Sequence, residues 1–409
     1  MTSGITNRQT FFLFLLMLFS TAIALLAPRL FGYITAVIGL LTTALVILNK
    51  DISLKEAWNN CDKTIWLYAA MLLGLIWVSN LWSIFQDSSI DRSLTISLIF
   101  IFSALLIIQH NFLSEETLES YLKAIPMIVI LCATLIIIEI LFGYPIYKTI
   151  KNAPDEYIGN SLINKSVTAF CFMLIPAVAI IKKTYQNKKR AMLLTLLIAS
   201  VGLAVFLSGS ETAKLSLLLV AIAWILFPKN LKAVWYLGII AVFAFTLAAP
   251  FGANYIYKNF SDDVYQNAII GQGGGHGAQR LEIYNFVSNY AMQKPILGHG
   301  VDVTRRISDF SNDGKYQKSN RILHPHNYAI QIWLDFGAVG ALLFAGFISL
   351  VLFKIFRLQS NRQAFLSLFI VSMCSYCFSY SLWQSWLIGL NFMAIFIIIL
   401  SDKIETLEA

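Results

Sequence analysis

The sequence predicts an all-α membrane protein that crosses the bilayer many times. Of its 409 residues, 58% are hydrophobic and only 13% are charged, whereas soluble domains usually carry about 25% charged residues. The apolar residues also fall in long runs, and a spanning helix needs roughly 20 mostly apolar residues in succession. Because a soluble core explains neither observation, we expect a polytopic membrane protein.

About twelve apolar runs of spanning length follow one another along the chain. The first begins at Phe11 and has no small-residue cleavage site behind it, so we interpret it as a span rather than a signal peptide. We expect the spans near residues 10–28, 31–49, 64–82, 93–109, 122–143, 161–181, 191–208, 212–228, 232–251, 328–356, 364–382 and 386–401.

The basic residues indicate the orientation of the spans. Three short connections, 182–190, 228–232 and 354–362, are rich in Lys and Arg. If the spans alternate in direction, all three connections lie on one side, and the positive-inside rule makes that side cytoplasmic. Both termini would then be cytoplasmic. Because topology accounts for the basic residues, the net charge of +8 gives no reason to expect a nucleic-acid partner.

One long connection, 252–327, would lie on the external, periplasmic side. It holds four of the five histidines and two glycine clusters. Loops of this length in a compact protein are usually functional or disordered, and a helix-like segment from Arg280 favours function. We therefore expect three regions: spans one to nine in 1–251, a loop with catalytic elements in 252–327, and an interfacial helix with the last three spans in 328–409.

The stretch LHPHNYAIQIWLDFGAVG, from Leu323, predicts the start of a helix. Proline is tolerated only in the first turn of a helix, so Pro325 places the start nearby. Polar residues then recur every four positions at Asn327, Gln331 and Asp335, with aromatic residues between them. This pattern is typical of an amphipathic helix at a membrane interface.

His326 is the candidate general base. The partial positive charge at a helix N-terminus disfavours imidazolium and keeps the ring neutral, which suits proton abstraction. The alternative is that His324 and His326 only form a turn into the helix. A zinc site is a further alternative because histidines can be ligands, but the chain has no HExxH spacing. We expect neither a metal nor a cofactor.

Several polar residues at the external ends are candidates for phosphate binding. Arg280 and Arg321 lie in the long loop, and an Arg fork matches phosphate oxygens, although any loop arginine can simply be solvated. Lys214 lies at the end of the eighth span, three residues from Glu211, with which it can also pair. The corresponding end of the sixth span carries Asn164 and Lys165.

Four segments together resemble the O-antigen ligase/polymerase superfamily of bacterial envelope glycosyltransferases. They are GNSLINKSVTAFCFMLIPA at 159–177, LSGSETAKLSLLL at 207–219, RLEIYNFVSNYAMQKPILGHG at 280–300 and HPHNYAIQIWLDFGAVG at 324–340. They occur in the order typical of that superfamily. One position departs from its pattern, because Glu211 stands where an arginine is common.

The resemblance implies a GT-C-like, all-α enzyme of the bacterial inner membrane. It would transfer a glycan from undecaprenyl diphosphate, without a metal and with inversion, and in the ligase branch the acceptor is a sugar of the lipid A–core. His326 would deprotonate the acceptor, and Arg280 would hold the diphosphate. We add two further candidate cations and five supporting polar residues, which are Lys214, Arg321, His324, Asn327, Gln331, Asp335 and Asn164.

Other functions remain open from the sequence. The polymerase branch extends the glycan on the lipid carrier, but a single long external loop favours a ligase. A ligase-like enzyme that glycosylates protein is a further alternative. A lipid-linked glycan flippase or another transporter would also have many spans, yet transporters tend to place polar residues near the membrane midplane. Here the polar residues gather at the external ends of the spans.

Overall fold

The computed structural model describes residues 5–48, 54–59, 61–114, 118–151, 163–228, 231–266, 276–307, 314–316 and 322–406. In these ranges the regular structure is helical and no strand occurs. Ten helical stretches among them are long and apolar enough to cross a membrane. The prediction of an all-α polytopic membrane protein is confirmed.

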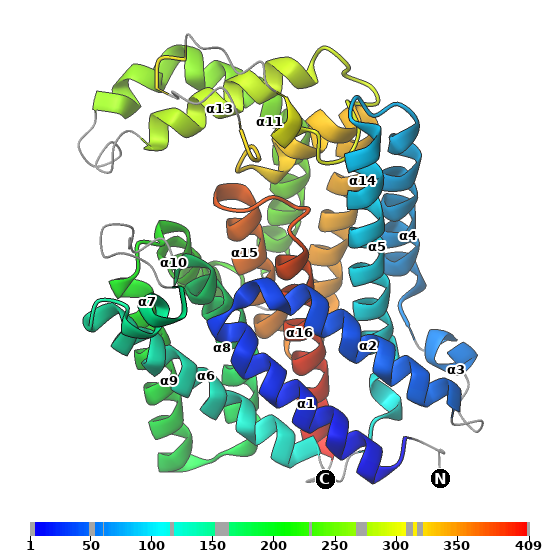
Figure 1. The fold of residues 1–409 in the computed structure, drawn as a ribbon, viewed down its shortest axis with the longest axis vertical. Coiled ribbons are helices and arrows are strands. Elements are labelled where there is room, and N and C mark those ends of the chain that lie inside the picture. The colour runs from blue at the N-terminus through cyan, green and yellow to red at the C-terminus, as the bar shows by residue number, and fades with distance from the viewer. Residues whose placement is uncertain are drawn as a thin grey trace.

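Each expected span corresponds to one long helix (Figure 1). These are α1 (Asn7–Leu26), α2 (Phe31–Leu48), α4 (Lys63–Val78), α5 (Gln86–Ile108), α6 (Leu118–Leu141), α8 (Asn164–Thr184), α9 (Asn187–Leu207), α10 (Glu211–Leu226), α11 (Lys232–Gln266), α14 (Tyr328–Arg357), α15 (Arg362–Phe378) and α16 (Ser385–Asp402). With 16 and 17 residues, α10 and α15 are not among the ten stretches of spanning length.

Shorter helices complete the described chain. They are α3 (Leu54–Asn59), α7 (Pro145–Lys151), α13 (His276–Ala291) and the 3₁₀ turns η1 (Pro28–Leu30), η2 (Ser79–Leu81), η3 (His110–Phe112), η6 (Thr304–Arg306) and η7 (Lys403–Thr406). Of these, α13 contains the helix-like segment that the sequence indicated from Arg280.

The ninth span ends later than expected. Its apolar run stops near residue 251, but α11 continues to Gln266. The extension packs on α13 through polar contacts: Asn254 Nδ2 donates to Asn289 Oδ1 at 3.0 Å, and the Tyr257 hydroxyl donates to Glu282 Oε1 at 2.9 Å. Packing against another helix, rather than contact with lipid, thus supports the last turns of α11.

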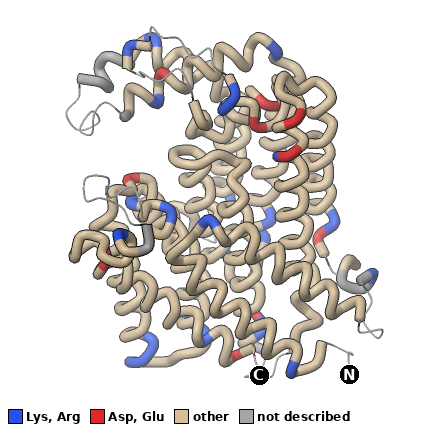
Figure 2. The backbone as a smooth tube through the Cα atoms, in the orientation of Figure 1, with Lys and Arg blue, Asp and Glu red and all other residues tan. Residues whose placement is uncertain are grey.

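The bundle has two distinct ends, which we call the α13 end and the terminal end (Figure 1). At the terminal end, Lys403 Nζ donates to the His110 carbonyl at 3.1 Å. Asp402 there pairs with Lys183 at 2.5 Å and accepts from Ser360 at 2.6 Å. The basic connections 182–190 and 354–362 therefore lie at one end, as expected. Figure 2 shows charged residues at both ends of the bundle and, beside α7 and α10, at mid-height as well.

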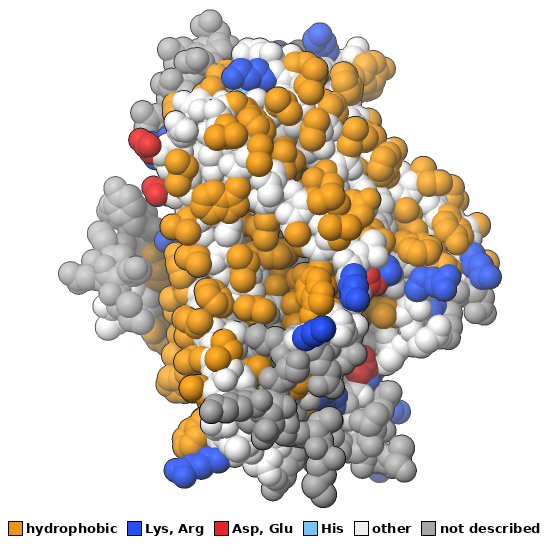
Figure 3. All heavy atoms as spheres, turned by 90° about the vertical axis from the view of Figure 1, so that its right-hand side faces the viewer, with side chains coloured by type: hydrophobic (Ala, Val, Ile, Leu, Met, Phe, Trp, Pro, Cys, Tyr) orange, Lys and Arg blue, Asp and Glu red, His pale blue; other side chains and the backbone are white. Residues whose placement is uncertain are grey.

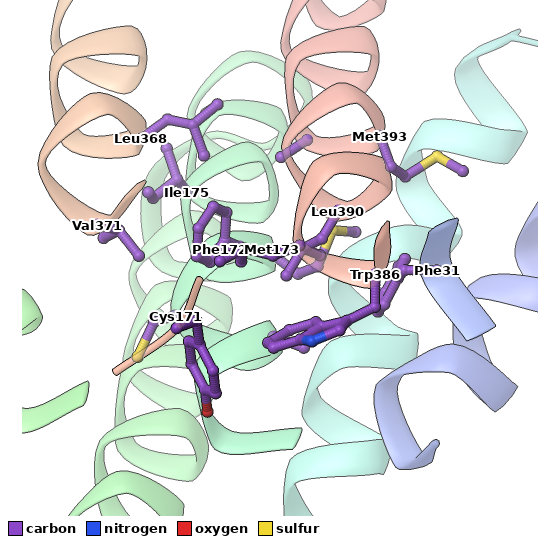
Figure 4. Close-up of a cluster of buried hydrophobic side chains, with 14 of the residues drawn as sticks. Phe31, Cys171, Phe172, Met173, Ile175, Leu368, Val371, Trp386, Leu390 and Met393 are labelled. Carbon is purple, nitrogen blue, oxygen red and sulfur yellow. The ribbon is translucent and has the colours of Figure 1, made fainter. Parts of the chain in front are cut away.

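The core lies where α8 and α16 cross α2 and α15. Figure 4 shows side chains from these helices, among them Phe31, Phe172 and Leu390, meeting in one apolar cluster. Close approach of α2 and α16 depends on small residues: a Cβ on Gly32 would lie 2.5 Å from the Ser385 carbonyl oxygen. Such contacts between small residues are typical of helices packed in a membrane.

The outer surface is apolar. Figure 3 shows hydrophobic side chains covering most of the face that α4 and α5 present. Large apolar residues such as Leu81 and Phe19 are 79% and 69% exposed. Extensive exposed apolar surface of this kind indicates contact with lipid.

Candidate active site

The turn that precedes α14 holds His326 in an unusual backbone conformation. His326 has φ +53°, in the left-handed region that non-glycine residues rarely adopt. Asn327 follows as the N-cap of α14, and its side chain accepts from the amides of Ala329 and Ile330 at 3.0 and 3.3 Å. The predicted helix start is therefore confirmed. Backbone strain of this kind tends to occur at functional sites.

The His326 ring is held in one tautomer. Its Nδ1 lies 3.1 Å from the carbonyl oxygen of Ser379, the residue that follows α15. Because a carbonyl only accepts hydrogen bonds, Nδ1 must carry the proton in the neutral ring. The lone pair is then on Nε2. The hydroxyl of Tyr284, on α13, donates to the His326 carbonyl at 3.2 Å and fixes the backbone of the same turn.

The surroundings of His326 keep its ring neutral. Burial lowers its pKa, the positive charge of Arg280 lowers it further, and the contact with Ser379 opposes them, leaving the pKa at about 4. Burial likewise raises the pKa of Tyr284 to about 12, so its hydroxyl stays a donor. A neutral ring with a free Nε2 lone pair is the form that a general base requires.

His324 lies beside His326. The two ring centroids are 4.1 Å apart and the planes make an angle of 51°. The backbone amide of His326 donates to His324 Nδ1 at 3.4 Å. His324 is therefore part of the same local structure, and the turn between the two histidines brings both rings to one place.

The predicted phosphate-binding cations that the structure describes, Arg280 and Lys214, have different surroundings. Arg280 lies in the second turn of α13, and its charge acts on both histidine rings. Lys214 Nζ instead pairs with Glu211 Oε1 at 2.9 Å, and the Glu211 side chain is 81% exposed. The pairing that the sequence allowed for Lys214 is thus present. Arg321 lies outside the described residues.

The first helical segment of α14 is buried rather than interfacial. All residues from Tyr328 to Gly337 are buried, and Trp333 Nε1 donates to the Thr246 carbonyl on α11 at 3.0 Å. The expectation of a helix lying on the membrane surface is therefore wrong. The aromatic residues that suggested a membrane interface pack against protein instead.

The predicted polar stripe of this segment binds the connection between α15 and α16. Gln331 Nε2 donates to Ser381 Oγ at 2.8 Å and its Oε1 accepts from the Leu382 amide at 3.1 Å. Asp335 Oδ2 accepts from Trp383 Nε1 at 2.6 Å. Gln331 and Asp335 therefore position the segment that contains Ser379.

A break in α14 joins this helix to the glycine-rich turn 295–300. Gly337 has φ +60° and ψ −154°, which leaves helical hydrogen bonds unmade on both sides. Four backbone bonds to the turn replace them: His299 N to Leu334 O at 2.8 Å, Gly300 N to Asp335 O at 2.9 Å, Ala338 N to Pro295 O at 2.8 Å and Val339 N to Ile296 O at 3.2 Å. The turn and the break thus form one structural unit.

The starts of α8 and α10 reach the same site. The Ser379 hydroxyl donates to Thr212 Oγ1, in the first turn of α10, at 2.6 Å. Thr168, in α8, contacts the buried Tyr380 hydroxyl at 3.2 Å and donates to the carbonyl of Asn164 at 2.8 Å. Asn164 thus begins α8 near the site, and its contacts described here are structural.

Sequence reasoning missed Ser379 and Tyr284. Ser379 acts through its backbone carbonyl, which every residue possesses, so no residue type indicates it. Tyr284 lies within the helix-like segment RLEIYNF from Arg280, four residues after the arginine. Because residues four apart lie on one face of a helix, this spacing could have indicated that Tyr284 lies on the same face of α13 as Arg280.

The fold and site define a multi-pass membrane protein with a neutral histidine beside an arginine at one end of its bundle. The model of the O-Antigen ligase family matches residues 191–345. A Rickettsia conorii protein named "Putative polysaccharide ligase" is 33% identical over 122 residues, which are 27% of this chain and 29% of that protein. A Rickettsia typhi protein of the same description is 34% identical over 115 residues, 27% and 28% of the two chains.

The matched residues 191–345 include Arg280, His324 and His326 and make up less than half of the chain. This match confirms the resemblance and contains three of the four sequence segments, whereas the segment at 159–177 lies outside it. The aligned part spans less than a third of each Rickettsia protein.

Proposed function

We propose that the protein is an O-antigen ligase. It would transfer a glycan from undecaprenyl diphosphate to a sugar of the lipid A–core, at the periplasmic face of the bacterial inner membrane. The observation that carries the proposal is the state of His326, whose Nδ1 contacts the Ser379 carbonyl and whose Nε2 is left as the basic atom. The match of residues 191–345 to the O-antigen ligase model supports the class of reaction.

The proposed reaction is a single displacement without a metal. His326 Nε2 takes the proton from the acceptor hydroxyl, and the resulting oxygen attacks the anomeric carbon of the donor from the face opposite the diphosphate. The bond between that carbon and the diphosphate oxygen breaks, and its electron pair leaves with the diphosphate. Attack from the opposite face inverts the anomeric configuration.

Arg280 would stabilise the leaving group. It makes no hydrogen bond or ion pair with any residue that the structure describes, and its charge acts on both histidines. A guanidinium fork matches the oxygens of a phosphate, and neutralising charge that develops in the transition state is a large term in catalysis.

The orientation follows from the basic connections. Because 182–190 and 354–362 lie at the terminal end, the positive-inside rule would place that end in the cytoplasm. The α13 end, and with it His326, would then face the periplasm, where both lipid-anchored substrates meet at the membrane surface.

A deletion strain tests the function. Glycan analysis of a ligase deletion should show long polymer on the lipid carrier and lipid A–core without it. Lipid A–core that carries one repeat unit would identify a polymerase instead. Intermediates confined to the cytoplasmic leaflet would identify a flippase, and either of these two results would overturn the proposal.

Substitution of His326, with a substitution of His110 as the control, tests the proposed base. We choose His326→Gly, because glycine accepts φ +53° without strain. Transfer should fall by at least ~10²-fold and recover in part with added imidazole. The control is His110→Ala at the terminal end, where His110 Nδ1 also contacts a carbonyl, that of Ile107, at 2.8 Å. Full transfer by the His326 variant, or equal losses in both, would refute the assignment.

A further inference from the structure

His324 presents the opposite chemical character to His326. Its Nδ1 accepts from the His326 amide, so in the neutral ring the proton is on Nε2. His326 has its proton on Nδ1 and its lone pair on Nε2. Two neighbouring rings, with centroids 4.1 Å apart, therefore offer one hydrogen-bond donor and one base.

His324 keeps its Nε2 proton without becoming charged. Burial lowers its pKa most, and the neighbouring His326 together with the positive charges of Arg305, Arg280 and Lys165 lowers it further, to about 3. The ring is thus neutral at physiological pH and cannot supply a proton as a general acid. It can, however, donate a hydrogen bond from Nε2 at any pH at which the protein works.

Three cations from separate elements act electrostatically on His324. Arg280 comes from α13, Arg305 from η6 and Lys165 from the first turn of α8. Arg305 pairs with Asp302 at 3.1 Å, and the same carboxylate holds Arg92 at 2.7 Å. This one acid is therefore already shared by two arginines.

Lys165 is the unexplained member of this group. It is half-buried and makes no hydrogen bond or ion pair with the part of the chain that the structure describes. Lys165 interacts electrostatically with Arg29 and His324. No acidic residue that the structure describes pairs with it. A half-buried cation with no acidic partner among the described residues attracts an anion, and here the anion would lie near His324.

We propose that His324 donates a hydrogen bond from Nε2 to an oxygen of the donor diphosphate, and that Lys165 is a second cation for that diphosphate beside Arg280. This proposal rests on the proposed function. The acceptor proton still goes to His326, and the electron pair of the breaking carbon–oxygen bond goes to the diphosphate. His324 transfers no proton and stabilises the charge that the leaving oxygens gain.

Lys165 also compensates for the departure from the family pattern at Glu211. Lys214, one turn after that position, is engaged by Glu211 at 2.9 Å. Lys165, which starts from a different helix, has no such partner among the described residues. The two lysines therefore form a matched pair for experiment.

Substitution of His324 by asparagine or by glutamine tests the Nδ1 and Nε2 edges of its ring separately. Asparagine places an oxygen near the Nδ1 position and can still accept from the His326 amide, whereas glutamine reaches the Nε2 position and can donate there. Purified protein in lipid nanodiscs would be assayed for glycan transfer. We expect His324→Asn to lower kcat/KM by about 10²-fold, the usual effect of removing one such donor, and His324→Gln to remain within about tenfold of wild type.

Binding of the product provides a readout that does not depend on transfer. Undecaprenyl diphosphate would be titrated into the same nanodiscs by calorimetry. Lys165→Met should weaken its binding about tenfold, and Lys214→Met should leave it unchanged. Thermal unfolding of each variant shows that the protein is folded, and the His326-dependent pH profile of transfer should not move in the His324 variants.

The outcomes are distinct. If Asn and Gln at position 324 are equally active, or if Lys165→Met binds undecaprenyl diphosphate as wild type does, the proposal is overturned. If wild-type protein transfers no glycan but binds undecaprenyl diphosphate in a way that depends on Lys165 as described, the proposed function fails while the diphosphate site stands.

Discussion

The break at Gly337 yields a quantitative prediction for Gly337→Ala. The conformation there, φ +60° and ψ −154°, is nearly restricted to glycine, and a side chain in it costs roughly 1–3 kcal/mol. A Cβ would also lie 2.5 Å from both the carbon and the oxygen of the Ile296 carbonyl. Because both are backbone atoms, no side-chain rotation relieves the contact.

The substitution must therefore displace the turn 295–300. The amides of Ala338 and Val339 donate to Pro295 and Ile296, and each bond lost costs about 1 kcal/mol. Together with the backbone strain, we expect a loss on the order of 3 kcal/mol in the free energy of unfolding. Transfer should fall as well, because the displaced turn is hydrogen-bonded to α14, the helix that begins directly after His326.

The assay is thermal unfolding of detergent-purified protein by tryptophan fluorescence, alongside glycan transfer. The matched control is Gly202→Ala in α9, where a Cβ would meet nothing within 4 Å and alanine should stabilise the helix by up to about 1 kcal/mol. We expect Gly337→Ala to unfold at a temperature lower by on the order of 5 °C. Equal unfolding temperatures for the two variants would refute the reasoning.

Two further predictions concern the turn around His326. As the pH falls, kcat/KM should decrease only near pH 4, because burial and the charge of Arg280 lower the pKa of His326 to about 4. Protonation of Nε2 at that pH removes the proposed base. An acidic limb near pH 6.5 would contradict this. Tyr284→Phe leaves the His326 carbonyl without its 3.2 Å donor and should lower stability by about 1 kcal/mol and turnover severalfold, with the acidic limb unmoved. Unchanged turnover and unfolding temperature would contradict the anchoring role of the hydroxyl.

The sequence predicted the spans well because lipid imposes a simple requirement. Each membrane-spanning helix must be long and apolar, so hydropathy alone locates it. It failed at the end of α11, where the helix continues beyond residue 251. Contacts such as Tyr257 with Glu282 support that extension, and a contact between distant segments leaves no local pattern.

The site was predicted in part for a similar reason. Pro325 and Asn327 mark a helix start locally, so the position of His326 could be inferred. The surroundings of the helix could not. A polar residue every fourth position looks the same whether it faces water or, as with Gln331, a buried connection. Likewise, three-residue spacing allowed Lys214 to pair with Glu211 but could not establish the pair, which the structure shows.

The short helices α10 and α15 have a consequence for the surrounding bilayer. With 16 and 17 residues, they are only about 24–26 Å long, whereas the hydrocarbon layer is about 30 Å thick. Their ends meet beside His326, through Ser379 and Thr212. Such a mismatch is relieved by local thinning of the membrane. The headgroup region would dip toward the histidines there, so the proposed lipid-linked donor would reach His326 while its hydrocarbon chain stays in the bilayer.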